Sequence, residues 1–247
     1  MRLILLRHGE STWNLENKFT GWTDVDLTEN GIYEASMAGK QLLKENIKLG
    51  TIHTSLLMRA IHTTKIVSKL LNFDEKKIQY NWRLNERHYG ALQGLNKSET
   101  AEKYGEERVK VWRRSFDTSP PHLTYDDKRH PRFDKNYINA KYNLPIGESL
   151  KDVIDRLNPF WNNFLKRMQE NSLNDHLIVA HSNSLRALIM MIEKLSKDEI
   201  ISVNIPTGIP LIYNFDSELK FVNKSYLIDN KELKKKQLLI EQQGRIK

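Results

Sequence analysis

Short apolar runs alternate with longer stretches of helical periodicity along most of the chain. The apolar runs cover residues 3–6, 51–55 and 177–180, and the helical patterns that follow them cover residues 28–46, 57–71 and 184–195. In the first helical pattern, Ala35, Ala38 and Leu42 recur every three or four residues, which places them on one buried face. A strand followed by a helix, repeated in this way, predicts βα units around a mainly parallel sheet.

The rest of the chain adds further helices, a late pair of strands and a long irregular connection. Helical patterns cover residues 96–114 and 149–170, strand-like runs cover residues 210–216 and 221–228, and residues 115–147 show no regular period. Pro159 is expected to kink the second of these helices, because proline lacks a backbone N–H. Thr28 is the expected N-cap of the helix predicted over residues 28–46.

These elements predict an α/β fold, a single three-layer domain with a mainly parallel central sheet flanked by helices and with a capping insertion. The expected domain covers residues 1–230, its insertion lies at about residues 87–147, and a basic C-terminal tail follows at residues 231–247. An irregular connection of this length is unusual in a compact domain and is typical of a functional segment. The tail is predicted to be either a short helix or disordered.

Composition narrows the classes of function. Lys and Arg number 39 against 31 Asp and Glu, a net charge of +8, which favours nucleic acids, acidic lipids or phosphorylated metabolites as partners. The absence of cysteine excludes a thiolate nucleophile and a cysteine-bound metal. No apolar run approaches the roughly 20 residues of a membrane helix, and the N-terminal run is too short for a secretory signal. We therefore expect a cytoplasmic protein.

Two histidines directly follow predicted strands, His8 after the first and His181 after the third. Ligands of an open parallel sheet bind at the carboxyl ends of its strands. Arg7 adjoins His8, and Arg59 and Arg186 lie on predicted helices that follow strands. An imidazole among guanidinium groups is held neutral, which leaves one ring nitrogen free to act as a nucleophile. Phosphorus is the electrophile that suits such a site, because arginines neutralise the charge of a transferring phosphoryl group.

The sequence contains none of the common metal-binding or nucleotide-binding motifs. It lacks H-E-x-x-H, an acidic calcium loop and a Walker glycine loop. Two histidines and several arginines supply the nucleophile and the positive charge that phosphoryl transfer requires. We therefore predict a reaction without a metal.

Segments spread over nearly the whole chain resemble one known family. They are residues 6–14 (L-R-H-G-E-S-T-W-N), 19–22 (F-T-G-W), 59–63 (R-A-I-H-T), 84–97 (L-N-E-R-H-Y-G-A-L-Q-G-L-N-K), 112–114 (W-R-R) and 204–211. The R-H-G run is common to the histidine phosphatase superfamily, whereas the segment 84–97 is far more specific. Together they resemble the 2,3-bisphosphoglycerate-dependent phosphoglycerate mutases of that superfamily.

The resemblance implies a role for each candidate residue. His8 would carry the phosphoryl group as a phosphohistidine, and His181 would stabilise the transition state from the other side of the phosphorus. Arg7 and Arg59 would clamp phosphoryl oxygens, and Glu86 would be the general acid and base for the substrate hydroxyl. The implied substrate-binding residues are Ser11, Asn14, Thr20, Gly21, Arg87, Tyr89, Lys97, Arg113, Arg114, Ser182 and Asn183.

The same resemblance implies a glycolytic isomerase that interconverts 3-phosphoglycerate and 2-phosphoglycerate without a metal. In this reaction, 2,3-bisphosphoglycerate would be both primer and intermediate. The partners would be small phosphorylated three-carbon acids, with neither nucleic acid nor membrane, and the chain would form a homodimer or homotetramer.

The chain departs from the family pattern in two places. Ile146 and Gly147 differ from the commoner residues before Glu148-Ser149, where we expect little effect, and Ser182 is the more important departure. These mutases usually read His-Gly-Asn-Ser-Leu-Arg where this chain has Ser182 in place of the glycine. Serine keeps the backbone N–H but adds a side chain beside the expected phosphate. If the position requires a positive φ, the serine is expected to cost about 1 kcal/mol of strain.

Three alternatives remain open at this point. A phosphatase, or a bisphosphoglycerate synthase/phosphatase, would use the same histidines, although Ser11, Thr20 and Gly21 match the mutase form. The charge and the lysine-rich tail would also suit a nucleic-acid-binding module, although no RRM, KH or helix-turn-helix signature accompanies them. An inactive scaffold is disfavoured because His8 and His181 are both present.

Overall fold

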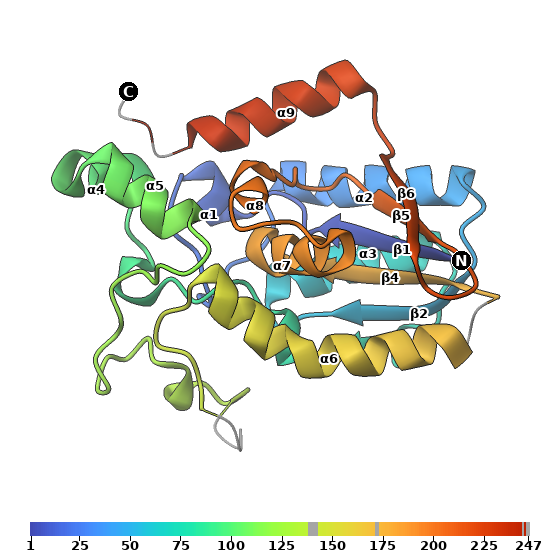
Figure 1. The fold of residues 1–247 in the computed structure, drawn as a ribbon, viewed down its shortest axis with the longest axis horizontal. Helices are drawn as coiled ribbons and strands as arrows, with labels where there is room; N and C mark the ends of the chain where they lie inside the picture. The colour runs from blue at the N-terminus through green and yellow to red at the C-terminus, as the bar shows by residue number, and fades with distance from the viewer. Residues whose placement is uncertain (138–142, 171–172, 244, 246–247) are drawn as a thin grey trace.

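The computed structural model describes residues 1–137, 143–170, 173–243 and 245. Within these residues lies a six-stranded sheet with the order β3-β2-β4-β1-β5-β6 (Figure 1). The strands are β1 (Arg2–Arg7), β2 (Leu49–Thr54), β3 (Gln79–Tyr80), β4 (Asp175–Ala180), β5 (Leu211–Phe215) and β6 (Phe221–Tyr226). The first four run parallel, and β5 and β6 are antiparallel additions at one edge. The predicted mainly parallel sheet is confirmed.

Helices cover both faces of the sheet. They are α2 (Glu29–Lys44) and α3 (Met58–Leu70) on one face, and α6 (Leu150–Glu170) and α7 (Ser182–Glu193) on the other. Ile4 and Leu6 of β1 pack with the α2 and α3 side, whereas Leu3 and Leu5 pack with the α6 and α7 side. Successive side chains of a strand point to opposite faces, so the all-apolar run of β1 supplies both layers of core. The three-layer α/β domain is confirmed.

The N-terminus of α2 shows how the local sequence sets an element. Thr28 accepts a hydrogen bond from the N–H of Gly31 at 3.0 Å, which confirms it as the N-cap. Gly9, just after β1, lies against this turn, and a Cβ on Gly9 would fall 2.1 Å from the Gly31 carbonyl oxygen. Glycine at position 9 is therefore required for the close approach of the β1 turn to α2.

The segment predicted as one helix over residues 96–114 forms two. They are α4 (Lys97–Tyr104) and α5 (Glu106–Arg114). Gly105 separates them with a φ of +88°, outside the helical region, so the prediction of a single helix is wrong. By contrast, α6 continues on both sides of Pro159.

Several short elements have no counterpart among the sequence predictions. They are α1 (Thr12–Leu15), α8 (Glu199–Ser202), the two-residue β3, and 3-10 turns at Glu75–Lys77, Trp82–Leu84, Gly90–Leu92 and Pro131–Phe133. Elements of two to four residues contain too few positions to show a periodicity. Backbone bonds tie the segment after α5 to its neighbours, from Ala91 N–H to Pro121 O at 2.8 Å and from Lys151 N–H of α6 to Phe116 O at 2.8 Å.

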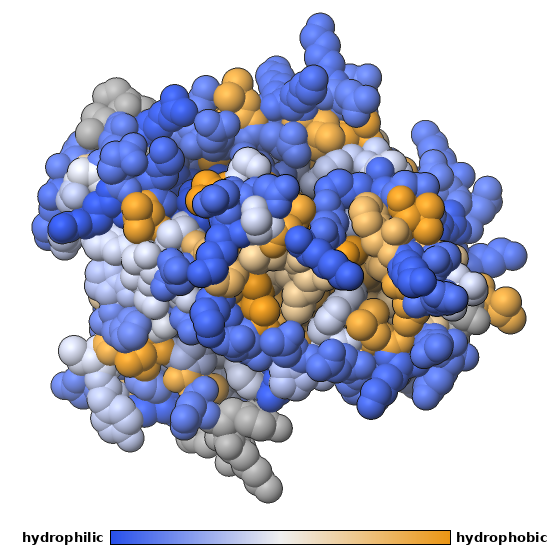
Figure 2. Space-filling model, viewed as in Figure 1, coloured by the Kyte–Doolittle hydropathy of each residue, from blue (hydrophilic) through white to orange (hydrophobic). Residues whose placement is uncertain are grey.

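The C-terminal tail forms the helix α9 (Asn230–Gln242), which begins at the N-cap Asp229. Figure 1 shows α9 lying across one side of the domain, with its C-terminal end toward α4 and α5. No residue of α9 is buried, and Leu238 and Leu239 are more than half exposed. Figure 2 shows polar side chains over most of this side, with apolar residues in separate patches. The helix therefore packs on the surface of the domain and contributes no residue to its core.

Among the helices that the structure describes, none has both the length and the apolar character of a membrane span.

Candidate active site

His8 and His181 lie side by side at the carboxyl ends of β1 and β4. The two strands are paired, and the N–H of His8 donates to the Ala180 carbonyl at 3.1 Å. The ring centroids are 5.0 Å apart with an angle of 57° between the planes. Both side chains are buried. The pairing of two parallel strands thus brings together histidines that are 173 positions apart in the chain.

The His8 ring is set up as a neutral imidazole with one free nitrogen. Its Nδ1 lies 2.7 Å from the Gly9 carbonyl oxygen, which can only accept, so Nδ1 carries the proton. Burial, followed by the charges of Arg59 and Arg7, lowers the pKa of His8 well below its usual value. The lone pair is therefore on Nε2, which makes no hydrogen bond to the described residues.

His181 is held through its other nitrogen. The Ser55 hydroxyl accepts from the Leu57 N–H at 3.2 Å and lies 2.7 Å from Nε2 of His181. The hydroxyl proton is free to donate to Nε2, which places the ring proton on Nδ1. Burial and the charge of Arg59 lower the pKa of His181 well below its usual value. Its Nδ1 is buried without a partner among the described residues, so this N–H is available to an anionic oxygen.

Two arginines lie close to the histidines. Arg59 is buried and donates to the carbonyls of Gly21 at 2.8 Å and Thr23 at 3.0 Å. Burial lowers the pKa of Arg59 to about 10, which leaves it charged at neutral pH. Arg7 donates to the Ile205 carbonyl at 2.8 Å, and its Nε has no partner among the described residues. We call His8, His181 and Arg59 the pocket floor.

Glu86 is held by backbone donors at one carboxylate oxygen. Its Oε1 accepts from the N–H of Arg87 at 2.7 Å and of Asn183 at 3.0 Å. Its main-chain carbonyl accepts from the Trp22 indole at 2.6 Å. Oε2 accepts no hydrogen bond from the described residues. The carboxylate therefore has one anchored oxygen and one oxygen free to exchange a proton.

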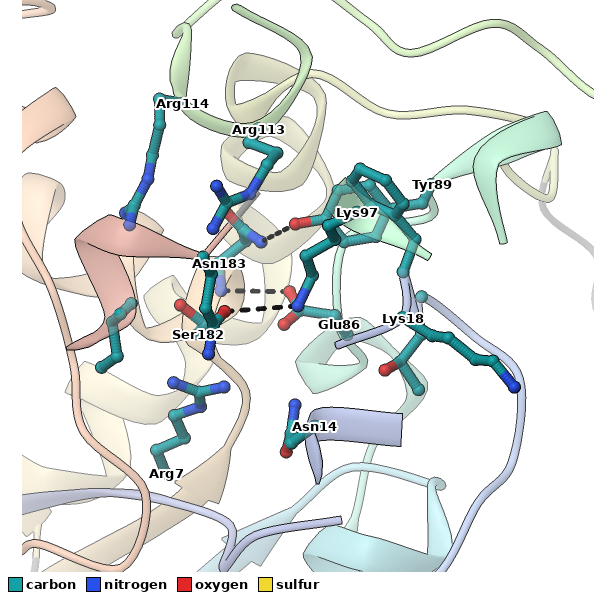
Figure 3. A pocket seen from close by; sticks show the side chains of 15 residues that line it. Arg7, Asn14, Lys18, Glu86, Tyr89, Lys97, Arg113, Arg114, Ser182 and Asn183 are labelled. Carbon is teal, nitrogen blue, oxygen red and sulfur yellow. Dashed lines mark hydrogen bonds between the residues drawn. The ribbon is translucent and has the colours of Figure 1, made fainter. Parts of the chain in front are cut away.

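A pocket opens beside Arg7 (Figure 3), and the buried residues of the pocket floor, His8, His181 and Arg59, are not among the residues that line it. Its lining includes most of the predicted site residues: Arg7, Asn14, Thr20, Gly21, Glu86, Tyr89, Lys97, Arg113, Arg114, Ser182 and Asn183. Figure 3 shows Arg7, Glu86 and Lys97 extending toward one space, with Arg113 and Arg114 reaching it from α5. Four further lining residues were not predicted: Lys18, Phe19, Ile240 and Gln243. Among the described lining residues, five cations face one carboxylate.

Two predicted binding residues lie behind the pocket wall instead of lining it. Ser11 is fully buried, and its hydroxyl and backbone bond Asn14 as the cap of α1. Arg87 is also buried, donates to the Arg113 carbonyl at 2.8 Å and places its guanidinium 4.7 Å from the Tyr89 ring centre. Both residues shape side chains that do line the pocket.

Burial and mutual repulsion make the charged forms of the pocket cations less favourable. Burial, followed by the charge of Arg113, lowers the pKa of Lys97 well below its usual value. Burial also lowers the pKa of Arg113 to about 10 and that of Arg186 to about 9. Among the described residues, unpartnered nitrogens remain at Arg7, which lines the pocket, and at Arg87 and Arg186, which do not. Such a pocket favours a ligand with several negative charges.

Ser182 is not strained. It is the first residue of α7, and it is not among the described residues with a positive φ. The condition for a strain cost, a positive φ, is therefore not met, because the chain has already entered the helix at this position. Its side chain is half-buried and lines the pocket beside Asn183.

Sequence reasoning missed residues of two kinds. Ser55 had a usable signal, because it ends the second predicted strand and so reaches the same sheet edge as His8 and His181. Ile240 and Gln243 had none, because their place in the pocket depends on how α9 crosses the domain. Among the described residues, no three His, Cys, Asp or Glu side chains form a group suited to a metal.

The comparisons with known proteins agree with one another. A model of the histidine phosphatase superfamily (branch 1) matches residues 3–224. The chain is 50% identical over 248 residues to the 2,3-bisphosphoglycerate-dependent phosphoglycerate mutase of Lachnoclostridium phytofermentans, a match covering 100% of this chain and 99% of that protein. It is 51% identical over 249 residues to the protein of that name from Treponema denticola, with 100% of both chains covered.

Solved structures share the fold at lower identity. A mycobacterial glucosyl-3-phosphoglycerate phosphatase has a TM-score of 0.71 and 22% identity, covering 93% of this chain and 98% of that one. A structure described as mycobacterial hydrolase 1 has the same TM-score and identity, covering 93% and 97%. At this identity the likeness concerns the fold alone. The chain belongs to the histidine phosphatase superfamily and, within it, to the family of 2,3-bisphosphoglycerate-dependent phosphoglycerate mutases.

Proposed function

We propose that this protein interconverts 3-phosphoglycerate and 2-phosphoglycerate through a phosphohistidine at His8, with 2,3-bisphosphoglycerate as primer and intermediate. The observation that carries the proposal is the buried neutral imidazole of His8, which makes no hydrogen bond through Nε2 to the described residues and adjoins Arg7 of a strongly cationic pocket. The names of the relatives from Lachnoclostridium phytofermentans and Treponema denticola support the choice of substrate. The partners are accordingly small phosphorylated three-carbon acids.

The first transfer loads the enzyme. Nε2 of His8 attacks one phosphorus of the bisphosphate, a P–N bond forms, and the bond from phosphorus to the substrate oxygen breaks. Glu86 gives a proton from Oε2 to the departing oxygen, so a neutral hydroxyl leaves. The product is a monophosphoglycerate and phospho-His8.

The second transfer reverses these events with the other hydroxyl. The free hydroxyl of 3-phosphoglycerate attacks phospho-His8 while Glu86 takes its proton, and the P–N bond breaks to restore the lone pair of Nε2. The bisphosphate formed then turns over in the pocket and returns its other phosphoryl group to His8, which leaves 2-phosphoglycerate. One nucleophile and one carboxylate therefore serve both directions.

The remaining floor residues stabilise the transferring group. The Nδ1–H of His181, unpartnered within the described chain, suits an equatorial phosphoryl oxygen, and the cations of Arg7 and Arg59 neutralise its charge. These donors are fixed by strand ends and carbonyl contacts before substrate binds, which limits reorganisation during the reaction. The substrate-binding roles predicted for the lining residues are proposals, as are these roles of His181, Arg7 and Arg59.

The test is to label the protein with 2,3-bisphosphoglycerate that carries radioactive phosphorus. We expect one acid-labile, base-stable label on His8, and no label in His8→Ala. His62→Ala is the matched control, because His62 is a half-exposed histidine on α3 that pairs with Asp26. A label on another residue, or one that survives in His8→Ala, would falsify the mechanism.

A phosphatase is the competing activity of the same site. Water that reaches phospho-His8 releases inorganic phosphate in place of 2-phosphoglycerate. Ile240 of α9 and Gln243, which directly follows α9, line the pocket, and this favours the mutase because these side chains restrict the access of water. Measuring phosphate release and 2-phosphoglycerate formation in one sample decides between them. The metal-independent reaction, the cytoplasmic location and the homodimer or homotetramer stay predictions.

A further inference from the structure

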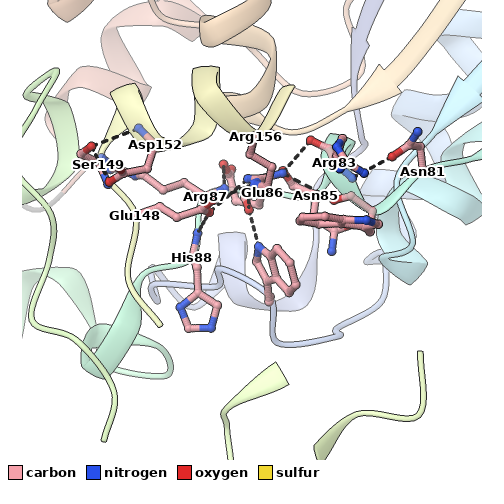
Figure 4. Close-up of polar contacts among 12 residues, drawn as sticks. Asn81, Arg83, Asn85, Glu86, Arg87, His88, Glu148, Ser149, Asp152 and Arg156 are labelled. Atoms are coloured by element: carbon pink, nitrogen blue, oxygen red, sulfur yellow. Dashed lines mark hydrogen bonds and ion pairs between the residues drawn. The ribbon is translucent and has the colours of Figure 1, made fainter. Parts of the chain in front are cut away.

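The backbone of the segment that carries Glu86 bonds to one arginine of α6, Arg156. We call residues 82–88 the acid–base segment. Four of its carbonyls accept hydrogen bonds from Arg156 of α6 (Figure 4), at 3.4 Å (Trp82), 2.6 Å (Arg83), 3.3 Å (Asn85) and 3.2 Å (Glu86). The carbonyl oxygens, which are the negative ends of their dipoles, lie close together here. A buried cation stabilises such a cluster of oxygens.

Arg156 is held in turn by Glu148. The Arg156 Nε lies 2.6 Å from Oε1 of Glu148 and its Nη2 lies 3.0 Å from Oε2, a bidentate pair with side chains 5% and 4% exposed. Oε2 of Glu148 also accepts from the His88 N–H at 2.8 Å, and the Glu148 N–H donates to the His88 carbonyl at 2.8 Å. The pair therefore fixes the acid–base segment from both of its ends.

We propose that Arg156, locked by Glu148, is the positioning residue for the acid–base carboxylate of Glu86, an inference that rests on the proposed function. Two backbone N–H groups hold Oε1 of Glu86, one from Arg87 within the segment and one from Asn183 at the start of α7. The position of Oε2 in the pocket therefore depends on where the backbone of residues 85–87 lies relative to α7. Arg156 sets that backbone position because it bonds the carbonyls of Asn85 and Glu86.

Arginine is the side chain that this arrangement requires. Its planar guanidinium presents N–H groups in several directions from one buried point, whereas lysine presents one compact ammonium. Arg156 does not line the pocket, so it does not contact the substrate. Its replacement should therefore reduce the rate of proton transfer and leave substrate binding nearly unchanged.

The first experiment compares Arg156→Lys with Arg167→Lys, a matched change at an arginine of the same helix that bonds Gln79 at the surface. We expect kcat of Arg156→Lys to fall by roughly 10- to 100-fold, the range expected when a reacting group is misplaced by about 1 Å. KM should stay within about twofold, and Arg167→Lys should match the parent. Glu148→Gln should shift kcat in the same direction, and thermal unfolding confirms that each variant is folded.

The second experiment uses a leaving group that needs no proton. Phosphorylation of His8 by p-nitrophenyl phosphate releases a stabilised phenolate, whereas phosphorylation by 2,3-bisphosphoglycerate releases an alkoxide that Glu86 must protonate. Arg156→Lys and Glu86→Gln should both slow phosphorylation by the bisphosphate and spare phosphorylation by p-nitrophenyl phosphate. In Glu86→Gln, adding Arg156→Lys should change the rate by less than about twofold, because the two residues act through one group.

The outcomes separate the inference from the function on which it rests. Equal slowing of both phosphorylations in Arg156→Lys, or a further large loss in the double variant, indicates a general structural role and overturns the inference. A slow Glu86→Gln with a normal Arg156→Lys overturns the inference alone. A normal Glu86→Gln overturns the acid–base role and the inference together.

Discussion

The pocket floor and the helix α9 above it are held in different ways. His8 and His181 sit at the ends of paired central strands, and their contacts are short, buried and made largely to the backbone or to Ser55. The polar contacts of α9 with the domain are only partly buried, including Gln237 to the Asn204 carbonyl at 3.1 Å and Lys236 to Glu34 at 3.7 Å.

This difference assigns the chemical step to the pocket floor and the control of access to the pocket to α9. Groups that react must be held within a fraction of an ångström, which a central sheet provides. A cover must open and close, and elements with few buried contacts open at low free-energy cost. One consequence is that substitutions in the floor should affect the chemical step, whereas changes in α9 should affect the exposure of the intermediate to water.

The largest effect is expected from the carboxylate at the edge of the floor. Glu86→Gln keeps the size of the side chain and removes the proton acceptor, so we expect kcat to fall by about 10²- to 10⁴-fold. KM for 3-phosphoglycerate should change little, because Glu86 adds no attraction for an anion. Steady-state kinetics measure both constants. A loss confined to KM would show that Glu86 binds substrate and does not transfer a proton.

Removal of the cover should have a smaller effect of a different kind. A chain that lacks residues 230–247 should fold, because no residue of α9 is buried. Hydrolysis of phospho-His8 should rise by roughly tenfold once water reaches it, a change of about 1.4 kcal/mol in the barrier. Phosphate release from the labelled enzyme measures this rate.

The control for the truncation is Lys235→Ala, which removes an exposed charge of α9 and leaves the helix in place. It should hydrolyse phospho-His8 at the parent rate. Equal hydrolysis by the parent and the truncated chain would mean that α9 does not protect the intermediate.

The buried histidines should make stability depend on pH. Burial lowers the pKa of His53 to about 4 and that of His88 to about 3, and it lowers the pKa values of the floor histidines as well. The unfolded chain takes up protons near pH 6.5, whereas the folded chain does not, so stability that is complete above this pH is lost as the pH falls. Each tenfold weakening of proton binding by the folded chain corresponds to about 1.4 kcal/mol of unfolding free energy.

Urea denaturation at a series of pH values between about 7 and 4 measures this dependence. The chain without residues 230–247 should show nearly the same slope, because α9 contains no histidine. A flat dependence over this range would contradict the burial of neutral imidazoles.

The smallest effect is expected at Ser182. Because this residue is already helical and has no positive φ, glycine there relieves no strain. Ser182→Gly should change mutase activity by less than about threefold and lower stability by a few tenths of a kcal/mol through the flexibility of glycine. Kinetics and thermal unfolding check the two values. A gain of about 1 kcal/mol in stability would restore the strain hypothesis.

Much of the fold was predictable because its elements are long and periodic. The runs at β1, β2 and β4, and the patterns of α2 and α3, contain enough positions to show their period. The helix broken at Gly105 was not predictable in this way, because glycine is also tolerated inside helices. The two-residue β3 exists only because β2 lies beside it.

The sequence by itself determined the chemical groups of the site and the strand ends that present His8 and His181, because these depend on neighbouring residues. Only the tertiary structure decided that Ser55 orients His181, that Gln243 reaches Lys97, and that Arg156 gathers the carbonyls around Glu86. These contacts join segments that lie far apart in the chain. Packing of whole elements sets such distances, and no local pattern of residues encodes them.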